Sequence, residues 1–104
     1  MTSRRYLALK IESSQVISEE EFKGAVWRAI LQLFGEYGAS KTGLIVISHE
    51  VVHNYAVLRC ANLAVDMVRA SLASITKINA KPVVVHVLGA SGTLKSLRRK
   101  FPPH

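Results

Sequence analysis

The sequence predicts an α+β domain, a ferredoxin-like β-α-β-β-α-β sandwich in which a four-stranded antiparallel sheet carries two helices and a basic helix is added at the C-terminus. Three observations support this fold class: apolar residues alternate over 4–11, a helix-initiation motif follows at 18–21, and β-branched apolar segments recur at 42–48, 55–60 and 81–89. The 104 residues are expected to form a single domain, 1–104.

The first strand is expected over residues 4–11. Its side chains alternate between two faces, with Leu7, Leu9 and Ile11 on one and Tyr6, Ala8 and Lys10 on the other. A period of two is typical of a strand with one buried face. The three large apolar residues should therefore face the helices, which leaves Tyr6 and Lys10 on the opposite side of the sheet.

The first helix is expected to begin at Ser18, because Glu21 follows three residues later and completes a capping box. Apolar residues then recur at spacings of three and four and form the predicted core face: Phe22, Ala25, Val26, Ala29, Ile30 and Leu33. Gly35 is expected to end this helix in a left-handed conformation.

A second apolar stripe lies beside that core face and consists of Trp27, Leu31 and Phe34, with Tyr37 following the glycine. A helix needs only one face for its own core, and aromatic residues are enriched at the centres of protein interfaces. We predict that these four residues contact a protein partner. The alternative is that the terminal helix or a loop of the same chain covers them.

The segments 42–48 and 55–60 predict a hairpin. Between them, the sequence HEVVH, from His49 through Glu50 to His53, matches the two-histidine motif of zinc peptidases. That chemistry needs a helix, because only there do residues four apart point at one ion. The connection 49–54 is too short for such a helix, so we predict partly solvated histidines and no metal site.

Asn62 is expected to cap a second helix that continues to about Ile78. Its predicted core residues are Ala64, Met67, Val68, Ser71, Leu72, Ile75 and Ile78. The fourth strand is predicted over 81–89, with Pro82 near its start, where a missing amide is tolerated. A short helix over 91–101 should turn Leu94, Leu97 and Phe101 inward and Lys95 and Arg99 outward. This order of elements is shared by ferredoxin-like and RNA-recognition folds.

The distribution of charge indicates a polyanionic partner. The net charge is +7, the sequence pI is about 10.0, and all seven acidic residues lie at or before Asp66. Nucleic acid is the first candidate, followed by an anionic membrane surface or an acidic protein. No segment is apolar enough to span a membrane, and the single Cys60 with an N-terminus unlike a signal peptide predicts a cytoplasmic protein.

Two surfaces are candidates for RNA. On the predicted sheet, Tyr6, Lys10, Tyr55 and Arg59 share the face opposite the helices, where tyrosines can stack on bases or, alternatively, pack under the last helix. In LGASGTLKSLRRK, the turn before the last helix and the cations on it can hold phosphates; the alternative is an ordinary capped, solvated basic helix. The predicted RNA-binding residues are Arg4, Arg5, Lys10, Arg59, Ser91, Gly92, Thr93, Lys95, Arg98, Arg99 and Lys100.

Four segments, read together, resemble the ribonuclease P protein component 2 family, the small subunit of archaeal and eukaryotic ribonuclease P. These segments are RRYLALKI, AVWRAILQLFGEYGAS, VLRC and LGASGTLKSLRRKF, and they occur in the family's order over nearly the whole chain. The sequence lacks the C-terminal extension of longer relatives and the acidic tail of eukaryotic ones, which favours an archaeal member.

The resemblance implies a protein cofactor of an RNA enzyme. Such subunits bind the ribonuclease P RNA, pair with a barrel-shaped protein subunit and other ribonuclease P proteins, and support removal of 5′ leaders from precursor tRNA, which they meet indirectly. A contact between two copies of the chain is a further possibility. The RNA cuts with Mg²⁺, so the chain itself is expected to hold no cofactor and no catalytic residue. Two other classes stay open: another RNA-binding module of this fold, and a ferredoxin-like regulatory domain.

Overall fold

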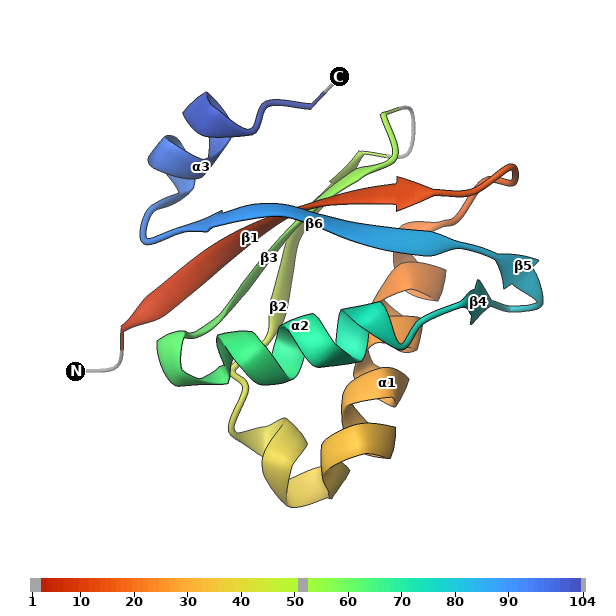
Figure 1. Cartoon of the computed structure of the whole chain (residues 1–104), viewed down its shortest axis with the longest axis horizontal. Coiled ribbons are helices and arrows are strands. Elements are labelled where there is room, and N and C mark those ends of the chain that lie inside the picture. The colour runs from red at the N-terminus through yellow and green to blue at the C-terminus, as the bar shows by residue number, and fades with distance from the viewer. Residues whose placement is uncertain (1–2, 51–52, 104) are drawn as a thin grey trace.

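The computed structural model describes residues 3–50 and 53–103. The elements, in chain order, are β1 (Arg4–Glu12), α1 (Glu19–Ser40), β2 (Ile45–Glu50), β3 (Tyr55–Ala61), the 3-10 helix η1 (Asn62–Ala64), α2 (Val65–Ala73), β4 (Lys77–Ile78), β5 (Lys81–Pro82), β6 (Val84–Ser91) and α3 (Leu94–Lys100). Four strands form an antiparallel sheet in the order β2-β3-β1-β6, and β4 and β5 form a small second sheet (Figure 1). This architecture confirms the predicted fold class.

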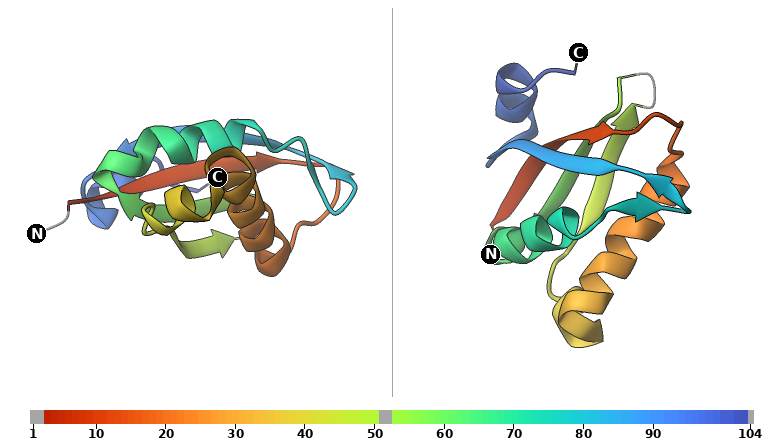
Figure 2. Two further views of the ribbon diagram at one scale, coloured as in Figure 1. Left: turned by 90° about the horizontal axis from the view of Figure 1, so that it is seen from below. Right: turned by 45° about the vertical axis from the view of Figure 1, so that its right-hand side comes forward.

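The sheet separates two layers of packing. One face of β1 packs with α1 and α2, and the cluster there contains Leu7, Leu9, Ile11, Phe22, Val26, Val68 and Leu72. The opposite face carries a smaller cluster under α3, which lies across the sheet from the other two helices (Figures 1 and 2). The predicted alternation of β1 is confirmed, because Ala8 belongs to the smaller cluster and Leu7 and Leu9 to the larger one.

Helix α1 begins as predicted. The Ser18 hydroxyl accepts a hydrogen bond from the Glu21 amide at 3.1 Å, and the Glu21 carboxylate accepts one from the Ser18 amide at 3.0 Å. At Gly35 the backbone adopts φ 72° and ψ 177°, so the first helical segment of α1 ends at this glycine with a positive φ, as predicted. A second helical segment follows the kink and continues α1 to Ser40, which the sequence did not predict. Leu33 was wrongly predicted as core: it is 48% exposed, because this end of α1 extends past the sheet (Figure 1).

The second helix is shorter than predicted. Asn62 does not cap it but begins η1, and the Asn62 side chain instead accepts a hydrogen bond from Arg5 Nε at 2.9 Å. Helix α2 starts after Ala64 without a side-chain cap and ends at Ala73. Ile75 and Ile78 are buried as predicted, although they lie beyond the helix, and Ile78 belongs to β4. Met67 is half-buried.

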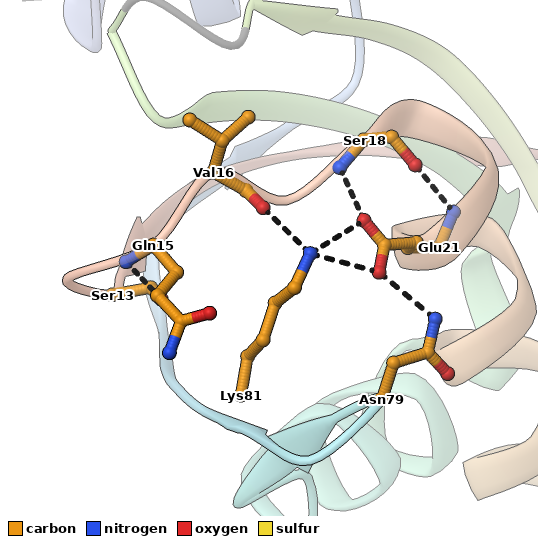
Figure 3. A network of polar contacts seen from close by, with 7 residues as sticks. All are labelled: Ser13, Gln15, Val16, Ser18, Glu21, Asn79 and Lys81. Carbon is orange, nitrogen blue, oxygen red and sulfur yellow. Dashed lines mark hydrogen bonds and ion pairs between the residues drawn. The ribbon is translucent and has the colours of Figure 1, made fainter.

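A polar network joins the turn between β4 and β5 to the start of α1 (Figure 3). Lys81 Nζ lies 3.1 Å from both carboxylate oxygens of Glu21 and donates to the Val16 carbonyl oxygen at 3.0 Å, and Asn79 donates to the same carboxylate at 2.9 Å. Asn79 and Ala80 both adopt positive φ in this turn. The strand predicted over 81–89 is divided in the structure. Pro82 lies in β5, which pairs with β4 outside the main sheet, and β6 begins at Val84.

Helix α3 is the predicted basic helix. Leu97 is fully buried, Leu94 and Phe101 pack against the same cluster, and Lys95 and Arg99 are exposed. The Phe101 ring lies directly over Gly89 of β6, where an added Cβ would come within 2.1 Å of the ring. None of the helices in the described ranges has the length and apolarity needed to cross a membrane.

Candidate nucleic-acid interface

One end of the sheet gathers several of the predicted RNA-binding residues. In the strand register, Arg4 lies opposite Ala61, and Tyr6 lies opposite both Arg59 and Ser91. Residues directly opposite on antiparallel strands share a face, so Arg59 stands on the α3 side of the sheet with Tyr6. The start of β1, the end of β3 and the end of β6 therefore meet at this end.

Three adjoining cavities hollow this end of the molecule. The first, about 480 Å³, is lined by Arg4, Lys41, Arg59 and Trp27 among others. The second, about 620 Å³, adds Ser3, Asn62, Leu63 and Met67, and the third, about 410 Å³, adds Arg5 and Gly92. Each pair of cavities has lining residues in common: Lys41 and Ala61 for the first and second, Ser3 and Asn62 for the second and third, and Arg4 for the first and third. Within the described part of the chain, cations line all three cavities and no Asp or Glu lines any of them.

Helix α3 follows directly after the third cavity along the chain and adds further cations. Gly92, which lines the third cavity, is followed by Thr93, whose hydroxyl accepts a hydrogen bond from the Ser96 amide at 3.2 Å and caps the helix. The exposed side chains of α3 are Lys95, Arg98, Arg99 and Lys100. Ser91 is buried at the end of β6, so its side chain is less accessible than those of its neighbours. We define the basic surface as Arg4, Arg5, Lys41, Arg59, Gly92 and the four α3 cations.

Lys10 lies apart from the basic surface. Its Nζ donates to the His53 carbonyl oxygen at 3.0 Å, near the hairpin that joins β2 and β3. Two neighbouring contacts, Glu12 with His86 at 3.0 Å and Glu50 with His53 at 3.2 Å, bring acidic side chains to that end of the sheet. The sequence prediction placed Lys10 correctly on its face, but the structure does not bring it together with Arg59.

The two tyrosines that were candidates for base stacking, Tyr6 and Tyr55, are not freely accessible to a base. Tyr55 is 3% exposed, and its hydroxyl donates a hydrogen bond to the Phe101 carbonyl oxygen. Burial raises the pKa of Tyr55. Tyr6 is half-buried and packs against the same cluster. Of the two alternatives, packing under the last helix is therefore confirmed, and base stacking on Tyr55 is excluded in this conformation.

The histidines of the HEVVH sequence point in different directions. His49 and Glu50 lie in β2, and the His49 ring packs against Phe22 with ring centroids 5.4 Å apart. Burial lowers the pKa of His49, while His53 pairs with Glu50. Val51 and Val52 lie outside the described residues. His49 lies in a strand, whereas a zinc-binding pair four residues apart needs a helix. Residues 3–50 and 53–103 contain no group of three or more His, Cys, Asp or Glu side chains arranged for a metal ion.

The structure separates the four residues of the predicted partner stripe. Leu31 packs against the core, whereas Phe34 lies beside Gly38 and is 37% exposed. Tyr37 is 76% exposed with Lys41 Nζ 4.6 Å from its ring centroid, a cation–π geometry. Trp27 is 42% exposed and lines the first cavity beside the cations. These four side chains therefore do not form one uniform patch, and their contact with a partner stays a prediction.

Lys41, Asn62 and Leu63 are parts of this end of the molecule that the sequence did not indicate. Lys41 follows α1 as an isolated cation in a loop, so neither periodicity nor a charge run marks it. Leu63 is 96% exposed in η1, a short turn that helical spacing had assigned to the second helix. The positive φ of Gly43 shapes the loop that carries Lys41, and Gly43 was the available sequence signal for a bend there.

The fold and the basic surface define a class: small basic α+β domains that present cations at one end of an antiparallel sheet. The chain belongs to the Rpp14/Pop5 family, whose model matches residues 5–102. Its relatives include ribonuclease P protein component 2 of Methanobrevibacter smithii, 39% identical with 93% of this chain and 87% of that protein covered. The corresponding protein of Pyrococcus furiosus is 36% identical, with 94% and 82% covered. The expected family and the expected role of ribonuclease P protein subunit are thereby confirmed.

A solved structure supports the fold. A chain in the cryo-EM structure of yeast ribonuclease MRP matches with a TM-score of 0.74 at 15% identity, covering 90% of this chain and 77% of that one. At this identity the match shows the fold alone.

Proposed function

We propose that this chain binds ribonuclease P RNA through the basic surface and supports RNA-catalysed removal of 5′ leaders from precursor tRNA. The observation that carries the proposal is the clustering of Arg4, Arg5, Lys41 and Arg59 around adjoining cavities that no described acidic residue lines. Phosphates are the dominant charge of RNA, and each Lys or Arg that neutralises one releases counterions. Four exposed cations on α3 extend the same potential.

Cleavage is assigned to the RNA, with Mg²⁺, and the chain has a binding role. Cys60 is poorly placed as a nucleophile, because it is fully buried and burial raises its pKa. A nucleophile must reach the reacting atom, which the burial of Cys60 opposes.

Protein partners are assigned to the surface where α1 ends and η1 begins. Phe34, Tyr37 and Leu63 expose apolar area there, beside the second cavity, and aromatic side chains of this kind anchor interfaces. The occupant is the barrel-shaped subunit of the complex, with a second copy of this chain as the alternative. Replacing Phe34 or Tyr37 by Ala should weaken the partner complex by about 2 kcal/mol while leaving RNA binding intact.

Recovery of the chain from its own cells, followed by sequencing of the bound RNA, tests the proposal. Ribonuclease P RNA should be the enriched species, and a variant lacking the α3 charges should recover less of it. Enrichment of a different RNA would support the other RNA-binding class. Recovery of no RNA above a matched control would contradict the proposal.

A further inference from the structure

The Nε atom of Arg59 is a buried donor without an acceptor. It has almost no solvent access and makes no hydrogen bond with any residue in 3–50 or 53–103. Leaving such a donor unpaired is costly, and unsatisfied buried groups in folded proteins usually have a specific reason. Arg59 also lines the first cavity, so a ligand oxygen there pairs this donor once the side chain turns its Nε toward the cavity.

The same cavity offers an aromatic surface and further positive charge. Trp27, Arg4 and Lys41 line it together with Arg59 and with Ile45, which lies opposite Arg59 in the strand register. Its volume of about 480 Å³ falls within the range of roughly 300–1,000 Å³ that small-ligand sites occupy. A lone phosphate would leave most of this space and the Trp27 ring unused.

The wall of the cavity is held by buried hydrogen bonds. Thr42 is fully buried, and its hydroxyl donates to the Ala39 carbonyl oxygen at 2.8 Å. The Thr42 carbonyl oxygen accepts from the Ala61 amide at 2.7 Å, which fixes the loop after α1 against the end of β3. The cavity therefore exists before any ligand binds, which reduces the ordering cost of binding.

We propose that this cavity binds one unstacked nucleotide of single-stranded RNA, with its base against Trp27 and its phosphate at Arg4 and Arg59. This inference rests on the proposed function and names the part of the RNA that the basic surface recognises. Unstacked bases are commonly bound on aromatic side chains, while Arg residues hold the adjoining backbone. The occupant is RNA because Arg4, Lys41 and Arg59 line the cavity without a described acidic residue, and this charge complements phosphate.

Trp27 is the single tryptophan of the chain, so its fluorescence reports directly on the cavity. The full chain is titrated with a short unstructured single-stranded RNA and with a duplex of the same sequence, both labelled so that total binding is measured by anisotropy. The single strand should quench Trp27 emission, and the duplex should bind without comparable quenching. Uridine monophosphate, the free-nucleotide probe, should quench only at much higher concentration than the strand.

Matched variants assign the effect to the cavity. Arg59→Gln should raise the concentration needed for quenching by about tenfold, whereas Arg69→Gln, an exposed cation on α2 outside the three cavities, should leave it unchanged. Trp27→Ala should lower single-strand affinity by about 5- to 150-fold, the equivalent of about 1–3 kcal/mol per stacked base, and Trp27→Phe should lower it less. Melting temperatures of all variants separate these effects from loss of the fold.

Several results would overturn the inference. RNA binding by anisotropy with unchanged Trp27 emission would exclude the cavity while leaving the proposed function in place. An emission change caused by the purified partner subunit or by self-association, and not by RNA, would identify a protein interface instead. Equal affinity for uridine monophosphate and for the strand would make the ligand a free nucleotide. Absence of any RNA binding would contradict the proposed function itself.

Discussion

The hydroxyl of Tyr55 on β3 donates a hydrogen bond to the carbonyl oxygen of Phe101, the residue that follows the last turn of α3. This bond, with Leu97 buried beneath the helix, fixes α3 on the sheet face that the helix pair leaves free. The four exposed cations of α3 are positioned by that contact. The orientation of these cations relative to Arg4 and Arg59 therefore depends on an uncharged contact between buried Tyr55 and half-buried Phe101.

Removing the hydroxyl should loosen α3 without unfolding the domain. We expect Tyr55→Phe to cost about 0.5–1.5 kcal/mol of the free energy of unfolding, the usual net value of one intramolecular hydrogen bond. Urea denaturation measures the cost, and hydrogen exchange at the Phe101 amide, which donates to the Leu97 carbonyl oxygen at 2.8 Å, should become faster. Tyr37→Phe, at an exposed position, is the control. Equal stability of native chain and Tyr55→Phe would show that the bond contributes nothing.

A second test addresses the ring that covers β6. In Gly89→Ala the new methyl group would lie within 2.8 Å of three Phe101 ring atoms, so the ring and the end of α3 must move. Overpacking of this kind typically costs about 1–3 kcal/mol. The melting temperature should fall, and combining the change with Phe101→Leu should recover part of the loss. Gly92→Ala meets no atom within 4 Å and should leave stability unchanged. No recovery in the double variant would refute the steric explanation.

The network around Glu21 predicts acid sensitivity. Hydrogen bonds from the Ser18 amide, Asn79 and Lys81 lower the pKa of Glu21 from 4.5 to about 2. A carboxyl whose pKa is lower in the folded than in the unfolded state stabilises the fold fully above the unfolded pKa, and this stabilisation is lost as pH falls from about 4.5 toward 2. Glu21→Gln should flatten the dependence of unfolding free energy on pH in that window. Glu20→Gln, in the same helical turn but outside the network, should not.

His49 predicts a second pH dependence of the same sign at higher pH. Burial against Phe22 lowers the pKa of its imidazole below 6.5, so the unfolded chain binds this proton more readily than the folded one. The contribution of His49 to the free energy of unfolding should be constant above about pH 6.5. It should decline as the pH falls from 6.5 through the lowered pKa of the folded state. Thermal melts of His49→Gln between pH 7 and 5 should lack the decline. A profile identical to that of the native chain would assign the titration to another residue.

Local signals predicted most of the fold. The alternation in β1 and the capping box at Ser18 depend on residues a few positions apart, and both were correct. Predictions failed where distant contacts decide the outcome. Asn62 has a side chain that commonly caps helices, but its oxygen accepts a hydrogen bond from Arg5, which is distant in sequence. Leu33 fits the helical period, yet the helix has passed the edge of the sheet at that point.

The candidate site was less predictable than the fold. The run of cations on α3 is visible as a sequence pattern, and Arg4, Arg5 and Arg59 were named from the strands that carry them. Their meeting with Lys41 and Trp27 around one cavity depends on the register of β1 and β3 and on the loop after α1. Neither composition nor spacing encodes a register, so this convergence appears only in the folded chain. The burial of Tyr55 under Phe101 is a tertiary effect of the same kind.

The salt dependence of binding to ribonuclease P RNA tests the central claim, that the basic surface contacts phosphates. Each phosphate contact contributes about 0.7–0.9 to the slope of log affinity against log salt. The double variant Lys95→Ala/Arg99→Ala, compared with Arg69→Ala as a charge-loss control, should reduce that slope by about one to two while the melting temperature stays unchanged. A folded double variant that keeps the full slope of the native chain would contradict the claim and exclude α3 from the RNA interface.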